Sequence, residues 1–186
     1  MITCGRILVA PVIGYWIANG EYDVALCGLI YAAISDWTDG ILARKFKLHT
    51  VLGSYLDPAA DKLLIMIATI TLTWQSIIPV WLTSLVVGRD IVLVGGWLAL
   101  IRNRHPQASL GNVFHTIQNT AMEPLLISKL NTTFQIALAF GGVLNAGEWS
   151  FLSDESLHNI GLATALTTTA SGISYGQRFW ARWNRL

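Results

Sequence analysis

The sequence predicts an all-α membrane protein, a single bundle of six transmembrane helices. Of its 186 residues, 53 % are hydrophobic and only 12 % are charged, whereas about a quarter of the residues in a soluble domain are charged. Apolar runs of helical length recur along the chain, with short connections between them. The Lys and Arg residues gather in alternate connections, as they do in proteins that cross a membrane several times.

The six helices are expected at residues 5–19, 22–44, 52–74, 78–101, 130–147 and 157–178. The first is a short apolar run. The second and third each join an apolar half to a pair of aspartates. The uncharged stretch from Leu63 to Gly88 is too long for one span. We therefore expect residues 74–76 and Pro79 to form a turn that divides it into two helices.

The later part of the chain contains one long connection, residues 102–129. Its mixed polar and apolar sequence predicts a segment that lies partly in the membrane interface. The last helix contains the Thr- and Ser-rich run 167–172, which we interpret as small-residue packing between helices. No linker or repeat interrupts the sequence, so residues 1–186 are predicted to form one domain.

The distribution of charge gives the expected orientation. With six spans, the N-terminus, residues 45–51, residues 102–129 and the C-terminus lie on one side. The basic residues on that side are Arg6, Lys45, Lys47, Arg102, Arg104, Lys129, Arg178, Arg182 and Arg185. The other connections hold no Lys or Arg, and their charged residues are all acidic: Glu21, Asp23, Glu148, Asp154 and Glu155. This asymmetry places residues 45–51 in the cytoplasm, or in the matrix of a mitochondrion. The basic residues indicate topology rather than nucleic-acid binding.

Four aspartates lie in the second and third predicted helices. Asp36 and Asp39 share a face of one helix, and Asp57 and Asp61 share a face of the next. An aspartate at the centre of a membrane costs roughly 2.5–3.5 kcal/mol, so four without partners would cost on the order of 10 kcal/mol. A pair of divalent ions would offset this cost, and carboxylate oxygens suit Mg²⁺ or Mn²⁺. All four aspartates are therefore candidate metal ligands.

Eight residues of this region resemble the signature of the CDP-alcohol phosphatidyltransferase family, D-x2-D-G-x2-A-R-x8-G-x3-D-x3-D. They are Asp36, Asp39, Gly40, Ala43, Arg44, Gly53, Asp57 and Asp61. The resemblance implies an integral membrane enzyme that moves a phosphatidyl or similar group from a CDP-activated lipid to an alcohol and releases CMP. It also implies that Asp61 is the general base that deprotonates the acceptor hydroxyl, besides being a candidate metal ligand. The active site is then expected at the membrane face that carries residues 45–51.

The remaining motif positions are candidate substrate-binding residues. Gly40 and Ala43 lack bulk, so the ligand can approach the helix backbone closely. Gly53 belongs to the same signature. Arg44 lies one helical turn after Gly40, where it would contact a phosphate or pair with a motif carboxylate.

Two isolated cations, Arg89 and Lys129, are further candidates for binding substrate. Each lies inside or at the end of an apolar helix, where a charge is expensive unless it has a partner. A phosphate on the acceptor would supply one. The alternatives are a buried ion pair between Arg89 and Asp90 or another acid, and a Lys129 side chain that reaches to the membrane surface.

Beyond the motif, the chain resembles the family members that make cardiolipin over nearly its whole length. One segment distinguishes best between family members with different acceptors: Ser128-Lys129-Leu130-Asn131-Thr132. Members that use glycerol 3-phosphate tend to have Gly-Lys-x-Lys-Thr there. The resemblance implies transfer from CDP-diacylglycerol to phosphatidylglycerol, with two Mg²⁺ or Mn²⁺ ions. It also implies the mitochondrial inner membrane, a site facing the matrix, and a homodimer, which family members often form.

Family members usually carry a leader before an entry motif of which only residues 2–6 can be matched here, so we expect that leader to be absent. Three other functions remain open. The nearest is the same chemistry with glycerol 3-phosphate as acceptor. An intramembrane prenyltransferase also binds Mg²⁺-diphosphate through aspartates, although its two acidic motifs would lie far apart. The third is a transporter or a non-catalytic membrane protein that retains the acidic motif.

Overall fold

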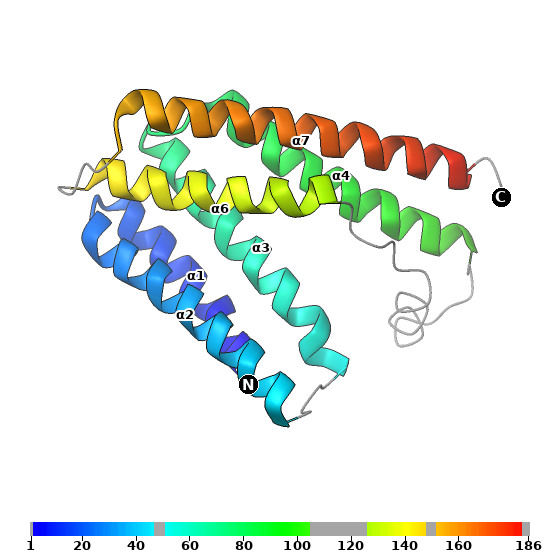
Figure 1. Ribbon diagram of the computed structural model, residues 1–186, viewed down its shortest axis with the longest axis horizontal. Coiled ribbons are helices and arrows are strands. Elements are labelled where there is room, and N and C mark those ends of the chain that lie inside the picture. Colours follow the sequence, from blue (N-terminus) through cyan, green and yellow to red (C-terminus); the bar gives the residue numbers. More distant parts are fainter. Residues whose placement is uncertain (1, 47–50, 105–125, 148–151, 184–186) are drawn as a thin grey trace. The chain divides into compact units, whose positions relative to one another are not determined.

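In the computed structural model, the described residues 2–46, 51–104, 126–147 and 152–183 form six α-helices and no strand (Figure 1). The helices are α1 (Ile2–Ala18), α2 (Tyr22–Phe46), α3 (Val51–Trp74), α4 (Val80–Arg104), α6 (Leu126–Ala146) and α7 (Asp154–Trp183). The prediction of an all-α protein is confirmed. Among the residues described, no helix combines the length and the apolar character that crossing a membrane requires.

The boundaries of the helices lie within three residues of the sequence prediction, apart from two larger extensions. Helix α6 begins at Leu126, so residues 126–129 are helical and not part of a connection. Helix α7 continues as far as Trp183, five residues beyond the predicted end. The interfacial segment predicted within 102–129 falls largely on residues 105–125, which lie outside the described part of the chain.

The turn predicted between α3 and α4 is confirmed, and it has the hydrogen bonds of a Schellman motif. The Ser76 N–H donates to the Thr73 carbonyl at 2.9 Å, and the Ile77 N–H donates to the Leu72 carbonyl at 3.0 Å. Ser76 has a φ of 61°, the left-handed conformation that this motif requires. Pro79 follows, so the chain turns before α4 begins.

The chain divides into two compact units. The first unit comprises residues 1–83 and 135–161, and the second comprises residues 84–134 and 162–186. In the first unit, α1 packs against α2 and α3. Gly14 of α1 permits the close approach of α3, because a Cβ at this position would lie 2.5 Å from Ile67 Cγ2. The α1 residues Ala10, Ile13 and Ile17 are fully buried. Small residues and apolar packing therefore fix the helix that supports α2 and α3.

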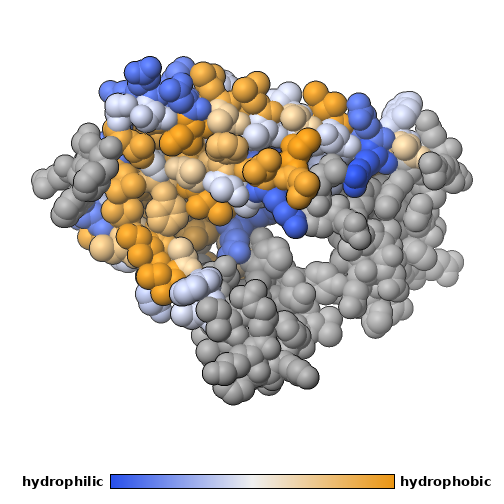
Figure 2. All heavy atoms as spheres, in the orientation of Figure 1, coloured by the Kyte–Doolittle hydropathy of each residue, from blue (hydrophilic) through white to orange (hydrophobic). Residues whose placement is uncertain are grey.

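Large apolar side chains are exposed on the helices of both units. Figure 2 shows many hydrophobic residues on the coloured part of the surface. The large apolar side chains with the greatest exposure include Leu8, Tyr31, Trp37, Val92, Leu126, Leu166 and Trp180. An exposed apolar surface of this kind marks contact with lipid or with another protein.

Candidate functional site

The aspartate motif lies on α2 and α3 of the first unit, as predicted. Asp36 and Asp39 are in the C-terminal half of α2, and Asp57 and Asp61 are in the first half of α3. Asp36 lies about 15 Å before the end of α2, and Asp61 lies about 15 Å after the start of α3, because a helix rises about 1.5 Å per residue. Only residues 47–50 join the two helices, so their ends lie within about 18 Å of each other. The two acidic pairs are thus carried at matching distances from one short connection.

The side chains of Asp36, Asp39 and Asp57 lie outside the described part of the structure, whereas Asp61 is half-buried. Its sequence neighbour Ala60, which lies on a different face of α3, is 1 % exposed. Among the described side chains, no three His, Cys, Asp or Glu residues gather closely enough to hold a metal ion. The donor set of the motif consists of carboxylates, which are the ligands that Mg²⁺ and Mn²⁺ prefer. The metal site and the base Asp61 remain predictions.

The other motif residues are helical, but their side chains also lie outside the described part. Gly40, Ala43 and Arg44 are in the last turns of α2, and Gly53 is in the first turn of α3. Their proposed contacts with substrate remain predictions.

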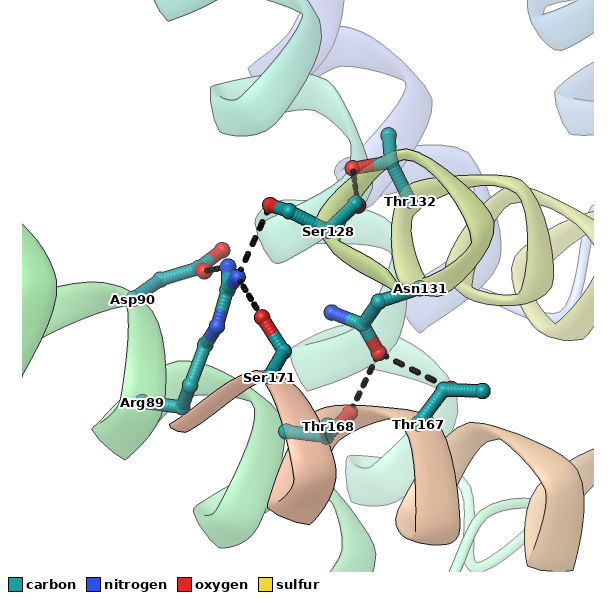
Figure 3. Close-up of polar contacts among 8 residues, drawn as sticks. All are labelled: Arg89, Asp90, Ser128, Asn131, Thr132, Thr167, Thr168 and Ser171. Atoms are coloured by element: carbon teal, nitrogen blue, oxygen red, sulfur yellow. Dashed lines mark hydrogen bonds and ion pairs between the residues drawn. The ribbon is translucent and has the colours of Figure 1, made fainter. Parts of the chain in front are cut away.

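The second unit contains a cluster of polar residues that the sequence did not predict to lie close together. It is called the Arg89 cluster below. It joins side chains from α4, α6 and α7 (Figure 3). Its members are Arg89, Asp90, Ser128, Asn131, Thr167, Thr168 and Ser171. Three helices thus direct polar groups toward one another.

Arg89 is the charged centre of this cluster. Its guanidinium forms an ion pair with Asp90, and the two side chains are 7 % and 20 % exposed. It also donates to Ser128 Oγ at 3.0 Å and to Ser171 Oγ. The guanidinium carbon lies 5.7 Å from the centroid of the Tyr175 ring, within the range of a cation–π interaction. The ion pair considered as an alternative for Arg89 is therefore present.

The cluster also holds two buried hydrogen-bond donors without an acceptor among the described residues, Arg89 Nε and Asn131 Nδ2. Asn131 is fully buried. Its Oδ1 accepts hydrogen bonds from Thr168 Oγ1 at 2.6 Å and from Thr167 Oγ1 at 3.1 Å. Its amide nitrogen points toward the side of the cluster on which Ser171 and Arg89 lie (Figure 3). An oxygen-rich group bound there would satisfy both donors.

Lys129, the second cation predicted to bind the acceptor, does not join this cluster in the described structure. Its side chain is exposed, whereas Ser128 and Asn131 direct their side chains into the cluster. Residues three apart, such as Ser128 and Asn131, share a face of a helix. Lys129, which follows Ser128 directly, lies on another face. The structure therefore separates Arg89 from Lys129.

Sequence analysis singled out the segment 128–132 by resemblance but did not name Ser128 or Asn131 as site residues, and it missed Thr167, Thr168 and Ser171. The run 167–172 was interpreted as small-residue packing, yet three of its residues make hydrogen bonds within the cluster. The available signal was the spacing of polar residues in apolar helices. Positions 128 and 131 are three apart, and so are positions 168 and 171.

Comparison with known proteins gives consistent matches. A family model described as CDP-alcohol phosphatidyltransferase matches residues 1–170. A Drosophila melanogaster protein named probable cardiolipin synthase (CMP-forming) is 36 % identical over 178 residues, covering 94 % of this chain and 55 % of that protein. The Homo sapiens cardiolipin synthase (CMP-forming) is 35 % identical over 178 residues, covering 94 % of this chain and 59 % of that protein.

A relative from Oryza sativa subsp. japonica has a different name, CDP-diacylglycerol–glycerol-3-phosphate 3-phosphatidyltransferase 1, chloroplastic. It is 36 % identical over 191 residues, covering 96 % of this chain and 56 % of that protein. The chain thus spans less than two thirds of the length of each of these three relatives. Two of the names give cardiolipin synthesis with formation of CMP, and the third names CDP-diacylglycerol and glycerol 3-phosphate.

Proposed function

The chain belongs to the CDP-alcohol phosphatidyltransferase family, and on that premise we propose that it transfers a phosphatidyl group from CDP-diacylglycerol to phosphatidylglycerol, giving cardiolipin and CMP. The observation that carries this proposal is the complete family motif, divided between the consecutive helices α2 and α3. Relatives named cardiolipin synthase, each matching 94 % of the chain, support the choice of acceptor.

The motif residues would divide the chemistry among them. Asp36, Asp39, Asp57 and Asp61 would hold two divalent ions, Mg²⁺ or Mn²⁺, which when bound neutralise the pyrophosphate and polarise the phosphorus under attack. Asp61 accepts the proton of the acceptor hydroxyl, whose oxygen then bonds to that phosphorus. The bond between the phosphorus and the CMP oxygen breaks, and CMP leaves with both electrons of that bond.

The remaining candidates bind and orient the substrates. Arg44 binds a phosphate of the donor, and Gly40, Ala43 and Gly53 leave room for the ligand beside the helix backbones. On the acceptor side, Arg89 is a buried cation whose Nε has no acceptor among the described residues, which supports its assignment to the phosphate of the acceptor. Lys129 is exposed, so it would act on the acceptor from the surface.

The proposed setting is a membrane, because both substrates are lipids. We propose that the six helices lie in the mitochondrial inner membrane, with residues 45–51 and the aspartate motif on the matrix side. The basic connections on one side and the exposed apolar side chains support this setting. A homodimer is part of the same proposal.

A second candidate keeps the donor and changes the acceptor to glycerol 3-phosphate. The name of the Oryza sativa relative favours it, at the same identity as that of the Drosophila melanogaster protein. The product would then be phosphatidylglycerophosphate.

One assay separates the two reactions. Purified protein in liposomes receives CDP-diacylglycerol and Mn²⁺ or Mg²⁺, with phosphatidylglycerol or glycerol 3-phosphate offered separately, and the lipid products are identified. Cardiolipin from phosphatidylglycerol alone is the expected result. Phosphatidylglycerophosphate from glycerol 3-phosphate would select the second candidate, and no transfer to either acceptor would contradict both.

A further inference from the structure

Helices α4 and α7 run in the same direction through the second unit (Figure 1). Arg89 of α4 donates to Ser171 of α7, and a Cβ at Gly96 of α4 would lie 3.4 Å from Phe179 Cε2 of α7. Beyond these contacts both helices continue, α4 for eight more residues and α7 for four more. The two helices therefore end on the same side of the unit. This part of the unit, residues 97–104 and 178–183, is called the basic end below.

The basic end carries four arginines and no acid. The arginines are Arg102 and Arg104 of α4, and Arg178 and Arg182 of α7. Neither residues 91–104 nor residues 156–183 contain an Asp or Glu. The acid that precedes Arg102 along α4 is Asp90, about 18 Å away along the helix axis. The two helices that carry these positive charges therefore supply no acid that balances them at this end.

Arg178 is the arginine of this group whose side chain the structure describes. It is exposed, and no hydrogen bond or ion pair joins it to another described residue. Trp180, two positions later, is 67 % exposed. Between them, Phe179 packs against Gly96 and holds this turn of α7 on α4. A cation and an indole ring thus project from one fixed turn of helix.

An exposed apolar stripe leads along α7 to the basic end. Leu166, Ile173 and Trp180 are seven residues apart, so they share one face of the helix, and they are 73 %, 58 % and 67 % exposed. The stripe is about 21 Å long, which is about the thickness of one leaflet of a bilayer with its headgroups. One face of α7 thus presents apolar side chains over the depth of a leaflet and ends beside arginines.

This arrangement matches the chemistry of an anionic phospholipid. An indole ring prefers the boundary between headgroups and acyl chains, because its ring is apolar and its N–H is a donor. An arginine near an anionic membrane surface contributes about fivefold to binding. A soluble polyanion would be attracted by the arginines but would leave the stripe of Leu166, Ile173 and Trp180 in water. The stripe therefore favours a lipid.

We propose that the basic end binds the headgroup of an anionic phospholipid of the surrounding leaflet, with an acyl chain along the exposed stripe of α7. The headgroup feature recognised is a phosphodiester with a single negative charge. The site uses none of the residues of the aspartate motif. This inference rests on the membrane setting of the proposed function, and it goes beyond that function because the bound lipid is not a reactant.

Binding of short-chain lipids tests the inference without turnover. The full chain is purified in detergent without metal, and bound lipids are counted by native mass spectrometry. The probes are dioctanoyl phosphatidylmethanol, an anionic diester with no hydroxyl that could act as acceptor, and dioctanoyl phosphatidylcholine, which is zwitterionic. The wild type is expected to bind the anionic probe at least about tenfold more tightly, and this preference should fall as NaCl is raised. Equal affinities for the two probes would overturn the proposal.

Charge variants assign the preference to the basic end. Arg178→Gln should weaken binding of phosphatidylmethanol about fivefold and leave phosphatidylcholine unchanged. Glutamine at all four arginine positions should remove the preference. Lysine at the same four positions should keep most of it, because attraction to the headgroup depends on charge, so the lysine variant keeps the test decisive if the glutamine variant fails to fold. A folded glutamine variant with the wild-type preference, or a lysine variant without any, would overturn the proposal.

Tryptophan variants test the place of the acyl chain. Trp180→Leu should weaken binding of both probes, because the ring lies on the proposed lipid stripe. Trp74 is a matched control: it is 83 % exposed at the end of α3, and no Lys or Arg lies within ten residues of it. Trp74→Leu should therefore leave both affinities unchanged. Equal effects of the two substitutions would contradict the placing of the acyl chain on α7.

The transfer assay separates this proposal from the proposed function. A wild type that releases CMP but binds the two probes equally would refute the lipid site and leave the enzyme assignment in place. A preference that depends on the arginines, in a protein that releases no CMP, would refute the enzyme assignment and keep the lipid site. Binding of heparin that depends on the arginines, without a preference for the anionic lipid, would assign the basic end to an acidic macromolecule and overturn the proposal.

Discussion

Replacing Arg89 with methionine tests whether this buried cation stabilises the fold, binds substrate, or does both. Arg89→Met keeps the length of the side chain but removes the guanidinium that forms an ion pair with the Asp90 carboxylate, which is 20 % exposed. Breaking a buried pair from one side costs about 3–5 kcal/mol, and the partial exposure of Asp90 places the expected loss near the lower value. A loss of about 3 kcal/mol lowers the melting temperature of a chain of this size by roughly 6–12 °C.

The double variant Arg89→Met/Asp90→Leu separates the two roles. It removes both charges of the ion pair, so most of the stability lost by breaking the pair from one side should return. Binding of glycerophosphoglycerol, the soluble headgroup of phosphatidylglycerol, should not return, because the guanidinium is still missing. The measurements are thermal unfolding in detergent and a headgroup titration. Each is made on the wild type, Arg89→Met, Asp90→Leu and the double variant.

The melting temperatures and headgroup affinities of the four proteins show whether Arg89 stabilises the fold, binds substrate, or does both. A double variant no more stable than Arg89→Met would show that the ion pair is not the source of the stability loss. Restored headgroup binding in the double variant would show that Arg89 acts only through the fold.

Two other predictions concern the first unit. Gly14→Ala should destabilise the protein by about 1–3 kcal/mol, because its Cβ would lie 2.5 Å from Ile67 Cγ2, whereas Gly5→Ala in the same helix has no atom within 4 Å and should be neutral or slightly stabilising. Equal melting temperatures for the two variants would contradict the tight packing of α1 on α3. Asp36→Asn and Asp61→Asn should each abolish turnover, while only the first should greatly weaken Mn²⁺-dependent binding of CDP-diacylglycerol, measured by equilibrium binding. Equal loss of binding in both would show that Asp61 contributes to metal-dependent binding as much as Asp36 does, and would contradict a main role for Asp61 as the base.

The helices could be predicted because their signals are local. Apolar runs, the turn before Pro79 and the polar connections all lie within a few residues of the boundaries they determine. The start of α6 was predicted at residue 130, whereas the helix begins at Leu126. In the structure Lys129 is exposed inside the helix, where a long charged side chain is tolerated on a solvent-facing surface.

The two candidate sites differ in how far the sequence could reveal them. The aspartate motif is compact, so its spacing alone identifies its residues, and the structure confirms their places on α2 and α3. The Arg89 cluster joins residues that are 39 and 82 positions apart, Ser128 and Ser171 with Arg89. No local pattern links such residues, because their proximity depends on how three helices pack. Only the adjacent pair Arg89–Asp90 could be anticipated.

The most direct test of the central claim is metal-dependent CMP release. Purified wild-type protein in liposomes that contain CDP-diacylglycerol and phosphatidylglycerol is assayed with Mn²⁺, with EDTA, and with Mn²⁺ restored after EDTA. The account predicts CMP and cardiolipin in equal amounts with Mn²⁺, none with EDTA, and recovery when the metal returns. CMP release that EDTA does not affect, or no CMP under any condition, would contradict the assignment of the aspartate motif as the catalytic centre.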